Sequence, residues 1–356
     1  MKYHLQFRRY ALAFCTPVRT AHGVWSEREG LIVRLEDEAR NVGYGEAAPI
    51  AQFGLETADE DEAGCRTLGE WTTAGEIEGL PARLACLRNA IGNARGDLKR
   101  GGDGAPPSGE KRAPYLGVAA LLPAGRAALA QIGPRAELGF RVFKWKVGVG
   151  DLADELAMLD DVCAALPTGA KLRLDANGAW DRRRAERCLE RCAQCPVEFL
   201  EQPIAADARG ATDVLLGLAG DYPTPIALDE SLVGEDDIER WIGAGWPGVF
   251  VVKPSLIGDV AGAVGRLAKA RASVVFSSAL ETGVGARMAL RVALAWAGGA
   301  DSPGSGPADA RSARAHGFGV WPLFADARFD GPFAVPFIRA EDVERLNPEA
   351  VWNALS

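Results

Sequence analysis

Short apolar runs recur along the chain from residue 115 onward, and a helix-like segment follows each of them. The predicted strands lie at 115–120, 139–147, 171–175, 197–201, 225–229, 249–253 and 273–277, with an eighth near 316–320. Strands that alternate with helices of about a dozen residues are typical of repeated βα units and a parallel sheet. The pattern therefore predicts an α/β barrel over residues 115–324.

The first part of the chain has a different pattern. Residues 1–95 combine β-like runs, such as the one at 30–36, with a helix-like stretch near 82–90, which predicts a separate α+β domain. Residues 96–114 are dense in Gly, Pro and charge, so we expect an exposed flexible linker or insertion there. The tail at 325–356 is expected to leave the barrel and pack back on the first domain.

Length and composition agree with this division and narrow the partners. The chain has 356 residues, and a barrel commonly takes about 250, so one barrel and a smaller domain fit. The net charge of −8 argues against nucleic acid, and no apolar stretch approaches the roughly 18 residues of a membrane span. Seven cysteines, an odd number, favour reduced thiols and a cytoplasmic protein. The oligomeric state stays open.

Charged side chains end five of the predicted strands. They are Lys144 and Lys146, then Asp175, Glu201 and Asp229, then Lys253. Side chains alternate between the two faces of a strand, so the two lysines share a face and Trp145 points the other way. Because barrel active sites lie at the carboxyl ends of the strands, these charges are expected to converge on one cavity. A single acid after a strand is often a helix cap, but three on consecutive strands are not explained that way.

The residue types indicate a chemistry. Three carboxylates with no His or Cys among them suit Mg²⁺, with Mn²⁺ as the other option. A divalent cation can bind a substrate carboxylate and take up the charge that develops when the neighbouring carbon loses a proton. A lysine can be the base, and the second ammonium group beside it favours its neutral form. We therefore expect a small-molecule carboxylate substrate and an enediolate intermediate.

These segments resemble the enolase superfamily, in its muconate lactonizing branch. The K-x-K pair, the three carboxylates and Lys253 match its motifs in order, and GYGEAAPI at 43–50 resembles a motif of its capping domain. The resemblance implies a (β/α)7β TIM-like barrel with an N-terminal α+β capping domain that the C-terminal tail completes. It also implies that Asp175, Glu201 and Asp229 bind the metal and that Lys146 moves the proton. Lys253 would act from the opposite face, and Lys144 would keep Lys146 poised.

Within that branch, five segments resemble the o-succinylbenzoate synthases of menaquinone biosynthesis. They are LRLDANGAW (172–180), LDESL (228–232), VVKPSLIGD (251–259), SSALETGVG (277–285) and HGFGVWPLF (316–324). The resemblance implies a Mg-dependent syn dehydration of 2-succinyl-6-hydroxy-2,4-cyclohexadiene-1-carboxylate to o-succinylbenzoate, catalysed by a carbon–oxygen lyase. It implies that Ser277 and Ser278 hold a substrate carboxylate and that Asn177 and Glu230 act around the metal. Loops near 22–29 and 52–56 would close over the substrate, with Phe53 touching it.

Three other functions are compatible with parts of this pattern. An N-succinylamino acid racemase or a dipeptide epimerase would use Lys146 and Lys253 as paired bases, but epimerases typically carry a D-x-D motif that the segment 307–319 lacks. A non-catalytic ligand-binding barrel would have no reason to bury these charges. A Schiff-base aldolase built on Lys253 would not need three carboxylates.

Overall fold

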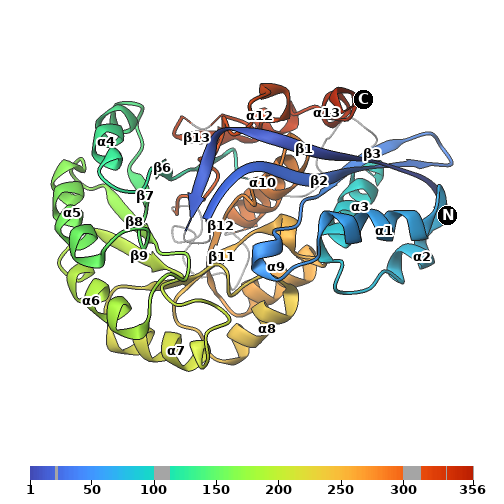
Figure 1. Ribbon diagram of the computed structural model, residues 1–356. Coiled ribbons are helices and arrows are strands. Elements are labelled where there is room, and N and C mark those ends of the chain that lie inside the picture. The colour runs from blue at the N-terminus through green and yellow to red at the C-terminus, as the bar shows by residue number, and fades with distance from the viewer. Residues whose placement is uncertain (21–22, 100–112, 300–313, 334, 356) are drawn as a thin grey trace.

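The computed structural model describes residues 1–20, 23–99, 113–299, 314–333 and 335–355 (Figure 1). Its N-terminal part is an antiparallel sheet in the order β3-β2-β1-β4. The strands are β1 (Lys2–Thr20), β2 (Gly23–Asp37), β3 (Val42–Ala47) and β4 (Trp71–Thr73). The helices of this part are η1 (Ala51–Phe53), α1 (Ala58–Leu68), α2 (Ala74–Glu78) and α3 (Ala85–Lys99).

The middle of strand β2, residues 30–33, is buried on both faces, which explains its continuous apolar run. Val33 and Leu35 belong to the core under the capping helices, whereas Ile32 belongs to the core shared with the barrel. Two capping boxes begin the helices beside this sheet, because Thr57 pairs with Glu60 and Thr73 with Glu76. The sheet therefore lies between its own helices and the barrel.

Helix α3 corrects the predicted boundary at residue 95. The helix continues to Lys99, into the first four residues of the segment 96–114 that the sequence assigned to a linker. Its apolar face continues through Leu98, which is buried, and the strand beneath it allows close contact. A Cβ at Gly45 of β3 would lie 1.9 Å from the Ala90 carbonyl oxygen. The remainder of the linker prediction, 100–112, lies outside the described residues.

Seven parallel strands follow, and neighbours along the chain are neighbours in the sheet. They are β6 (Ala120–Leu122), β7 (Val142–Lys146), β8 (Lys171–Asp175), β9 (Val197–Glu201), β10 (Ile226–Leu228), β11 (Val249–Val252) and β12 (Ser273–Phe276). The helices that surround them are α4 (Ala127–Glu137), α5 (Leu152–Ala165), α6 (Arg182–Cys192), α7 (Ala211–Asp221), α8 (Glu235–Gly243), α9 (Val260–Lys269) and α10 (Gly283–Gly298) (Figure 1).

Single parallel bridges complete the ring. Val118 pairs with His316, and Ser277 pairs with Gly317, so the segment after residue 314 lies between the first and last strands of the sheet. The predicted fold class, a TIM-like barrel with an N-terminal α+β capping domain, is confirmed.

Two predicted strands differ from the structure. The first, at 115–120, is divided: β5 (Tyr115–Gly117) pairs antiparallel with β13 (Phe337–Arg339) of the tail, and the barrel strand begins only at Ala120. At this point the backbone stops pairing with the tail and begins to pair with the segment near residue 316. Val118 N bonds to Pro336 O, and Ala119 N bonds to His316 O. The eighth, at 316–320, makes only isolated bridges, since glycines at 317 and 319 interrupt it.

The C-terminal tail contacts both parts of the molecule. It contains η4 (Ala327–Phe329), β13, α12 (Ala340–Glu344) and α13 (Pro348–Ala354). The ring of Trp352 lies 6.1 Å from the ring of Tyr44 on β3. The guanidinium of Arg8 on β1 lies 4.3 Å from the centre of the Trp352 ring. Glu344 forms an ion pair with Arg291 of α10. The tail thus touches the capping sheet as well as the barrel.

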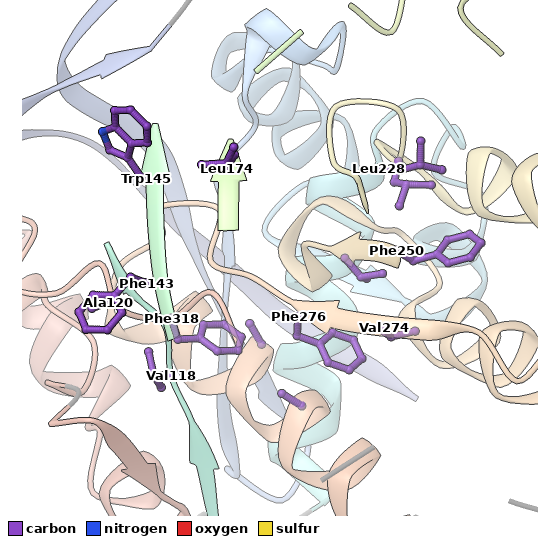
Figure 2. Packing of buried hydrophobic residues seen from close by; sticks show 14 of the residues in the cluster. Val118, Ala120, Phe143, Trp145, Leu174, Leu228, Phe250, Val274, Phe276 and Phe318 are labelled. Atoms are coloured by element: carbon purple, nitrogen blue, oxygen red, sulfur yellow. The ribbon is translucent and has the colours of Figure 1, made fainter. Parts of the chain in front are cut away.

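The alternation of side chains along the strands separates two apolar clusters. Phe143, Trp145 and Leu174 point outward into the large core between the strands and their helices (Figure 2). Phe199, Ala227, Val249, Val251 and Val275 form a smaller cluster inside the barrel. Lys144 and Lys146 alternate with the outward residues of β7, as the strand parity predicted. Among the described residues, no helix combines the length and apolarity that crossing a membrane requires.

Candidate active site

Charged side chains from β7, β8 and β9 meet at the carboxyl ends of these strands. The Nζ atom of Lys144 lies 2.7 Å from Glu201 Oε1 and 3.0 Å from Asp175 Oδ2. Lys146 Nζ lies 3.0 Å from the same Asp175 oxygen and 2.7 Å from Asn177 Oδ1. Each of these strands ends at or just after its functional residue, so the barrel itself positions the cluster.

A second ion pair belongs to the next two strands. Asp229 follows the last residue of β10, and Lys253 follows the last residue of β11 and precedes the short helix η2 (Pro254–Leu256). Lys253 donates to Asp229 Oδ1, and both side chains are buried. The Lys253 ammonium also lies 5.2 Å from the ring centre of Phe53, which comes from the capping domain. Phe53 therefore lies at the site where the sequence prediction placed it.

The two clusters share one electrostatic environment. Burial alone would raise the pKa of Asp175, but the ammonium groups of Lys144 and Lys146 hold that pKa well below its usual range. Burial opposes the charge on Lys144, and the carboxylates of Asp175 and Glu201 outweigh it and raise the pKa of Lys144. Burial lowers the pKa of Lys253 to about 7, although Glu201 and Asp175 act against that shift.

Two polar residues just beyond the ends of β8 and β9 form hydrogen bonds with other residues of the site. Asn177 donates to Glu230 Oε1 at 2.9 Å, and burial together with Asp175 raises the pKa of Glu230 to about 7. Gln202 is fully buried and accepts from the backbone N–H groups of Asp229 and Ser231. Both Asn177 and Gln202 have positive φ angles, 45° and 37°. The sequence analysis missed Gln202, and its only signal was a polar residue between Glu201 and Pro203.

The carboxylates fit a hard divalent cation by chemistry, because Asp175, Glu201 and Asp229 offer only oxygen ligands and are buried on three adjacent strands. Within the part of the chain that the structure describes, however, no three Asp, Glu, His or Cys side chains are already gathered as a metal site. The lysines contact the carboxylates instead. A cation that binds here competes with Lys144 and Lys253 for these oxygens.

A solvent-open cleft of about 410 Å³ lies between the capping domain and the strand ends. It is lined by Gly23, Val24, Trp25, Ile50, Gln52, Phe53, Asn177 and Glu230. The two segments named from the sequence, near 22–29 and 52–56, thus face the barrel residues across this cleft, although residues 23–29 belong to strand β2 and not to a loop. Of its lining, Ile50 lies outside the ranges that the sequence analysis named for this contact.

Ser277 and Ser278 lie at the end of β12, beside β11, because Ser277 N bonds to Val252 O at 2.9 Å. Their hydroxyl groups bond within the protein: Ser277 Oγ lies 3.2 Å from Gly317 O, and Ser278 Oγ lies 3.2 Å from Glu281 Oε2. Neither serine is among the residues that line the cleft. Their contact with a substrate stays a prediction.

Family models match both parts of the chain. One described as "Enolase C-terminal domain-like" matches residues 127–309, just over half of the sequence. Another, described as "MenC, N-terminal domain", matches residues 2–83. The two matches correspond to the barrel and to the capping sheet with its first helices.

Curated relatives and a solved structure give a consistent identity. The o-succinylbenzoate synthase of Thermosynechococcus vestitus is 40% identical over 78% of this chain and 84% of its own. That of Edwardsiella ictaluri is 30% identical over 84% of this chain and 87% of its own. A crystal structure of o-succinylbenzoate synthase from Thermosynechococcus elongatus BP-1, with Mg in the active site, covers 99% of both chains at 35% identity and a TM-score of 0.77. The chain therefore belongs to the o-succinylbenzoate synthase family of the enolase superfamily.

Proposed function

We propose that the chain catalyses the Mg²⁺-dependent syn dehydration of 2-succinyl-6-hydroxy-2,4-cyclohexadiene-1-carboxylate to o-succinylbenzoate. The observation that carries the proposal is the meeting of Lys146 with Asp175 and Asn177 at the ends of β7 and β8, while Lys253 pairs with Asp229 at the ends of β10 and β11, three strands further along. The names of the relatives support this substrate.

Lys146 is the proposed catalytic base and acid. Its Nζ atom is held by Asp175 and Asn177, so it has a fixed position from which to take the proton beside the substrate carboxylate. In a syn elimination the proton and the hydroxyl group leave from the same face. One lysine can therefore remove the proton and then protonate the departing hydroxyl.

Lys253 is proposed to act from the opposite face. Its ammonium group is buried and lies 5.2 Å from the ring centre of Phe53, so a substrate ring bound beside them would contact both a buried charge and an aromatic side chain. A cation there stabilises the negative charge of an enediolate more strongly than it would in water. Lys144 holds Asp175 and Glu201 and keeps positive charge beside Lys146.

Asp175, Glu201 and Asp229 are proposed to hold Mg²⁺, or Mn²⁺ in its place. When bound, the cation supplies positive charge that stabilises the enediolate oxygens.

Ser277, Ser278 and Asn177 are proposed to bind the substrate carboxylates, and Phe53 to cover the ring. The proposed division of the chain is a capping domain that extends to the end of α3 at Lys99, a connecting segment, a barrel at 115–324 and the tail. All seven cysteines are unpaired, which supports a reducing compartment such as the cytoplasm.

The test is a direct assay of the cyclohexadiene acid with Mg²⁺, with and without a chelator, in wild type and in Lys146→Ala. We expect Lys146→Ala to lose about 10³-fold or more in kcat, while Mg²⁺ and o-succinylbenzoate still bind in calorimetry. Lys269→Ala, an exposed lysine on α9, is the control and should keep full activity.

Several results would overturn the proposal. Absent conversion by wild type would leave only the family assignment, and a binding barrel would lose nothing from Lys146→Ala. Racemization of an N-succinylamino acid at a rate equal to or above the dehydration would show that the lysines serve as paired bases. Trapping of a substrate adduct by borohydride would indicate a Schiff-base enzyme.

A further inference from the structure

The turn from Ser277 to Thr282 joins β12 to α10 and carries the proposed carboxylate-binding serines. Glu281 closes this turn from inside: its Oε2 atom accepts from Ser278 Oγ at 3.2 Å and from the backbone N–H of Ala279. Leu280 has a φ of 61°, a left-handed conformation that a leucine rarely adopts. Such a conformation persists only where its surroundings hold it.

A carboxylate from the other domain holds the end of this turn. Glu46 on β3 is 2% exposed and accepts from Thr282 N at 2.9 Å and from Gly285 N at 2.8 Å. The hydroxyl groups of Thr282 and Tyr10 also donate to it. Glu46 thus binds the free N–H groups at the N-terminus of α10, where a negative charge is favourable.

The fit around Glu46 is close. A Cβ added at Gly285 would lie 3.0 Å from Glu46 Oε2 and 2.8 Å from the Cβ of Glu281. The Oε1 atom of Glu281 has no hydrogen-bond partner among the described residues, and the side chain is fully buried. The turn therefore depends on the contacts that Glu46 makes, because Glu281 anchors it through only one oxygen.

Arg28 on β2 contacts the same turn with the opposite charge. Its guanidinium donates to Ala279 O at 3.2 Å and to Pro49 O at 2.7 Å, and it also contacts Ala48 O. One side chain thus links the turn to the loop that leads to Phe53. The capping domain thus contacts the turn at two points. Glu46 binds the backbone N–H group of Thr282 at the end of the turn, and Arg28 binds the carbonyl oxygen of Ala279 in its middle.

We propose that Glu46 is a positioning residue for substrate binding, which acts by holding the turn 277–282 so that Ser277 and Ser278 face a substrate carboxylate. The capping domain then shapes the site in two ways, by the loops over the cleft and by a buried contact behind it. Loss of Glu46 leaves the N–H groups of Thr282 and Gly285 without an acceptor, and the strained turn relaxes. This inference rests on the proposed function through the two serines.

The test compares Glu46→Ala, Glu46→Gln and Asp97→Asn with wild type, using KM, kcat, the Kd for o-succinylbenzoate and the Kd for Mg²⁺. Asp97 is the matched control, since it joins α3 to Arg287 and Arg291 of the same helix α10, away from the turn. We expect Glu46→Ala to raise KM and the product Kd about 10- to 100-fold, with Mg²⁺ affinity within about twofold of wild type. Glu46→Gln keeps one acceptor oxygen and should show a smaller rise, about 3- to 10-fold.

The outcomes separate the inference from the proposed function. Inactive wild type would overturn the proposed function, while an unchanged product Kd in Glu46→Gln and Glu46→Ala would overturn the role of Glu46 alone. An equal rise of KM in Asp97→Asn would show that any broken contact between the domains has this effect, and would also overturn it. If Glu46→Ala does not fold, Glu46→Gln decides the question.

Discussion

Lys144 is a cation in direct contact with two of the proposed metal ligands. Its ammonium group bonds to Asp175 and Glu201, so a divalent cation at these carboxylates meets a like charge a few ångströms away. Two such charges repel by several kcal/mol at the effective dielectric constant of about 20 that suits protein sites. The lysine that is proposed to keep Lys146 poised for catalysis is thus expected to oppose metal binding.

Lys144→Met is therefore expected to bind Mg²⁺ more tightly than wild type, by about tenfold or more, because it removes the like charge and frees Glu201, while Asp175 keeps only its contact with Lys146. Isothermal titration calorimetry measures this without any turnover. Lys269→Met, an exposed lysine on α9, is the control and should leave the affinity unchanged. A weaker affinity in Lys144→Met would mean that the ammonium group organises the carboxylates for the metal instead of competing with it.

Asp61 on α1 gives a prediction about stability and pH. The side chain is fully buried, neither of its oxygens has a hydrogen-bond partner within the described part of the chain, and burial with the nearby Glu56 raises its pKa to about 8. Its folded-state pKa lies above its unfolded value, so the unfolded state loses the proton first as pH rises. The free energy of unfolding should then fall between about pH 4 and pH 8 and level off above that.

Asp61→Asn removes this dependence. We expect it to stabilise the protein by about 2–4 kcal/mol at pH 8 and to give a much smaller gain at pH 4. Urea unfolding at both pH values measures the difference, and Asp213→Asn, an exposed acid on α7, should change stability by less than about 0.5 kcal/mol. A gain that does not depend on pH would show that ionisation of Asp61 is not its cause.

At the scale of residues, the sequence predicted positions better than contacts. Alternation along the strands placed Lys144 and Lys146 on one face, and the apolar cluster inside the barrel agrees with that parity. The pairing of Lys144 with both carboxylates could not be read, because it depends on distances between side chains of three strands. Gln202 was missed because a polar residue before a proline has no pattern of its own.

At the scale of elements, Gln202 joins the ends of β9 and β10. Its side-chain oxygen accepts from Asp229 N and Ser231 N, and its amide nitrogen donates to Ile204 O and Ser231 Oγ. The three bonds to Asp229 and Ser231 fix the turn that follows β10 and with it the backbone of the proposed ligand Asp229. The side chain of Gln202 thus holds the backbone in place at the ends of β9 and β10.

Gln202→Ala should therefore weaken Mg²⁺ binding about 10- to 100-fold, as loss of a group that supports a metal ligand commonly does. It should also destabilise the fold by roughly 3–5 kcal/mol, because several buried polar groups lose their partners. Calorimetry and urea unfolding measure the two effects. Gln194→Ala, at an exposed position in the turn after α6, should change neither, and an unaltered metal affinity in Gln202→Ala would contradict the role assigned to Gln202.

The elements that sequence reasoning placed best are those with strong local signals. The predicted bounds of β8 and β9 agree with the structure, because each is an apolar run that ends in an acid. The first and eighth strands were misplaced, since their pairing is decided by the distant segments at 316–317 and 336–339. No local pattern reveals such partners.

At the scale of the whole molecule, the barrel and the capping domain share many buried polar contacts. Glu46 reaches Thr282, Asp97 reaches Arg287 and Arg291, and Asn89 on α3 donates to the carbonyl oxygens of Pro254 and Ile257. These partners are separated by 165 residues or more along the chain, so no local sequence pattern indicates them. Such contacts indicate that the two parts unfold together.

Metal binding should then stabilise the entire protein. Mg²⁺ at about 100 times its Kd adds roughly 2.7 kcal/mol to the folded state, which for a chain of this size raises the Tm by roughly 3–6 °C. Because the proposed ligands come from three barrel strands and the interface couples both parts, we expect one calorimetric transition that moves as a whole. Asp229→Asn should lose most of the shift. Two transitions, of which only one responds to Mg²⁺, would show instead that the capping domain unfolds on its own and that its contacts with the barrel are weaker than their burial implies.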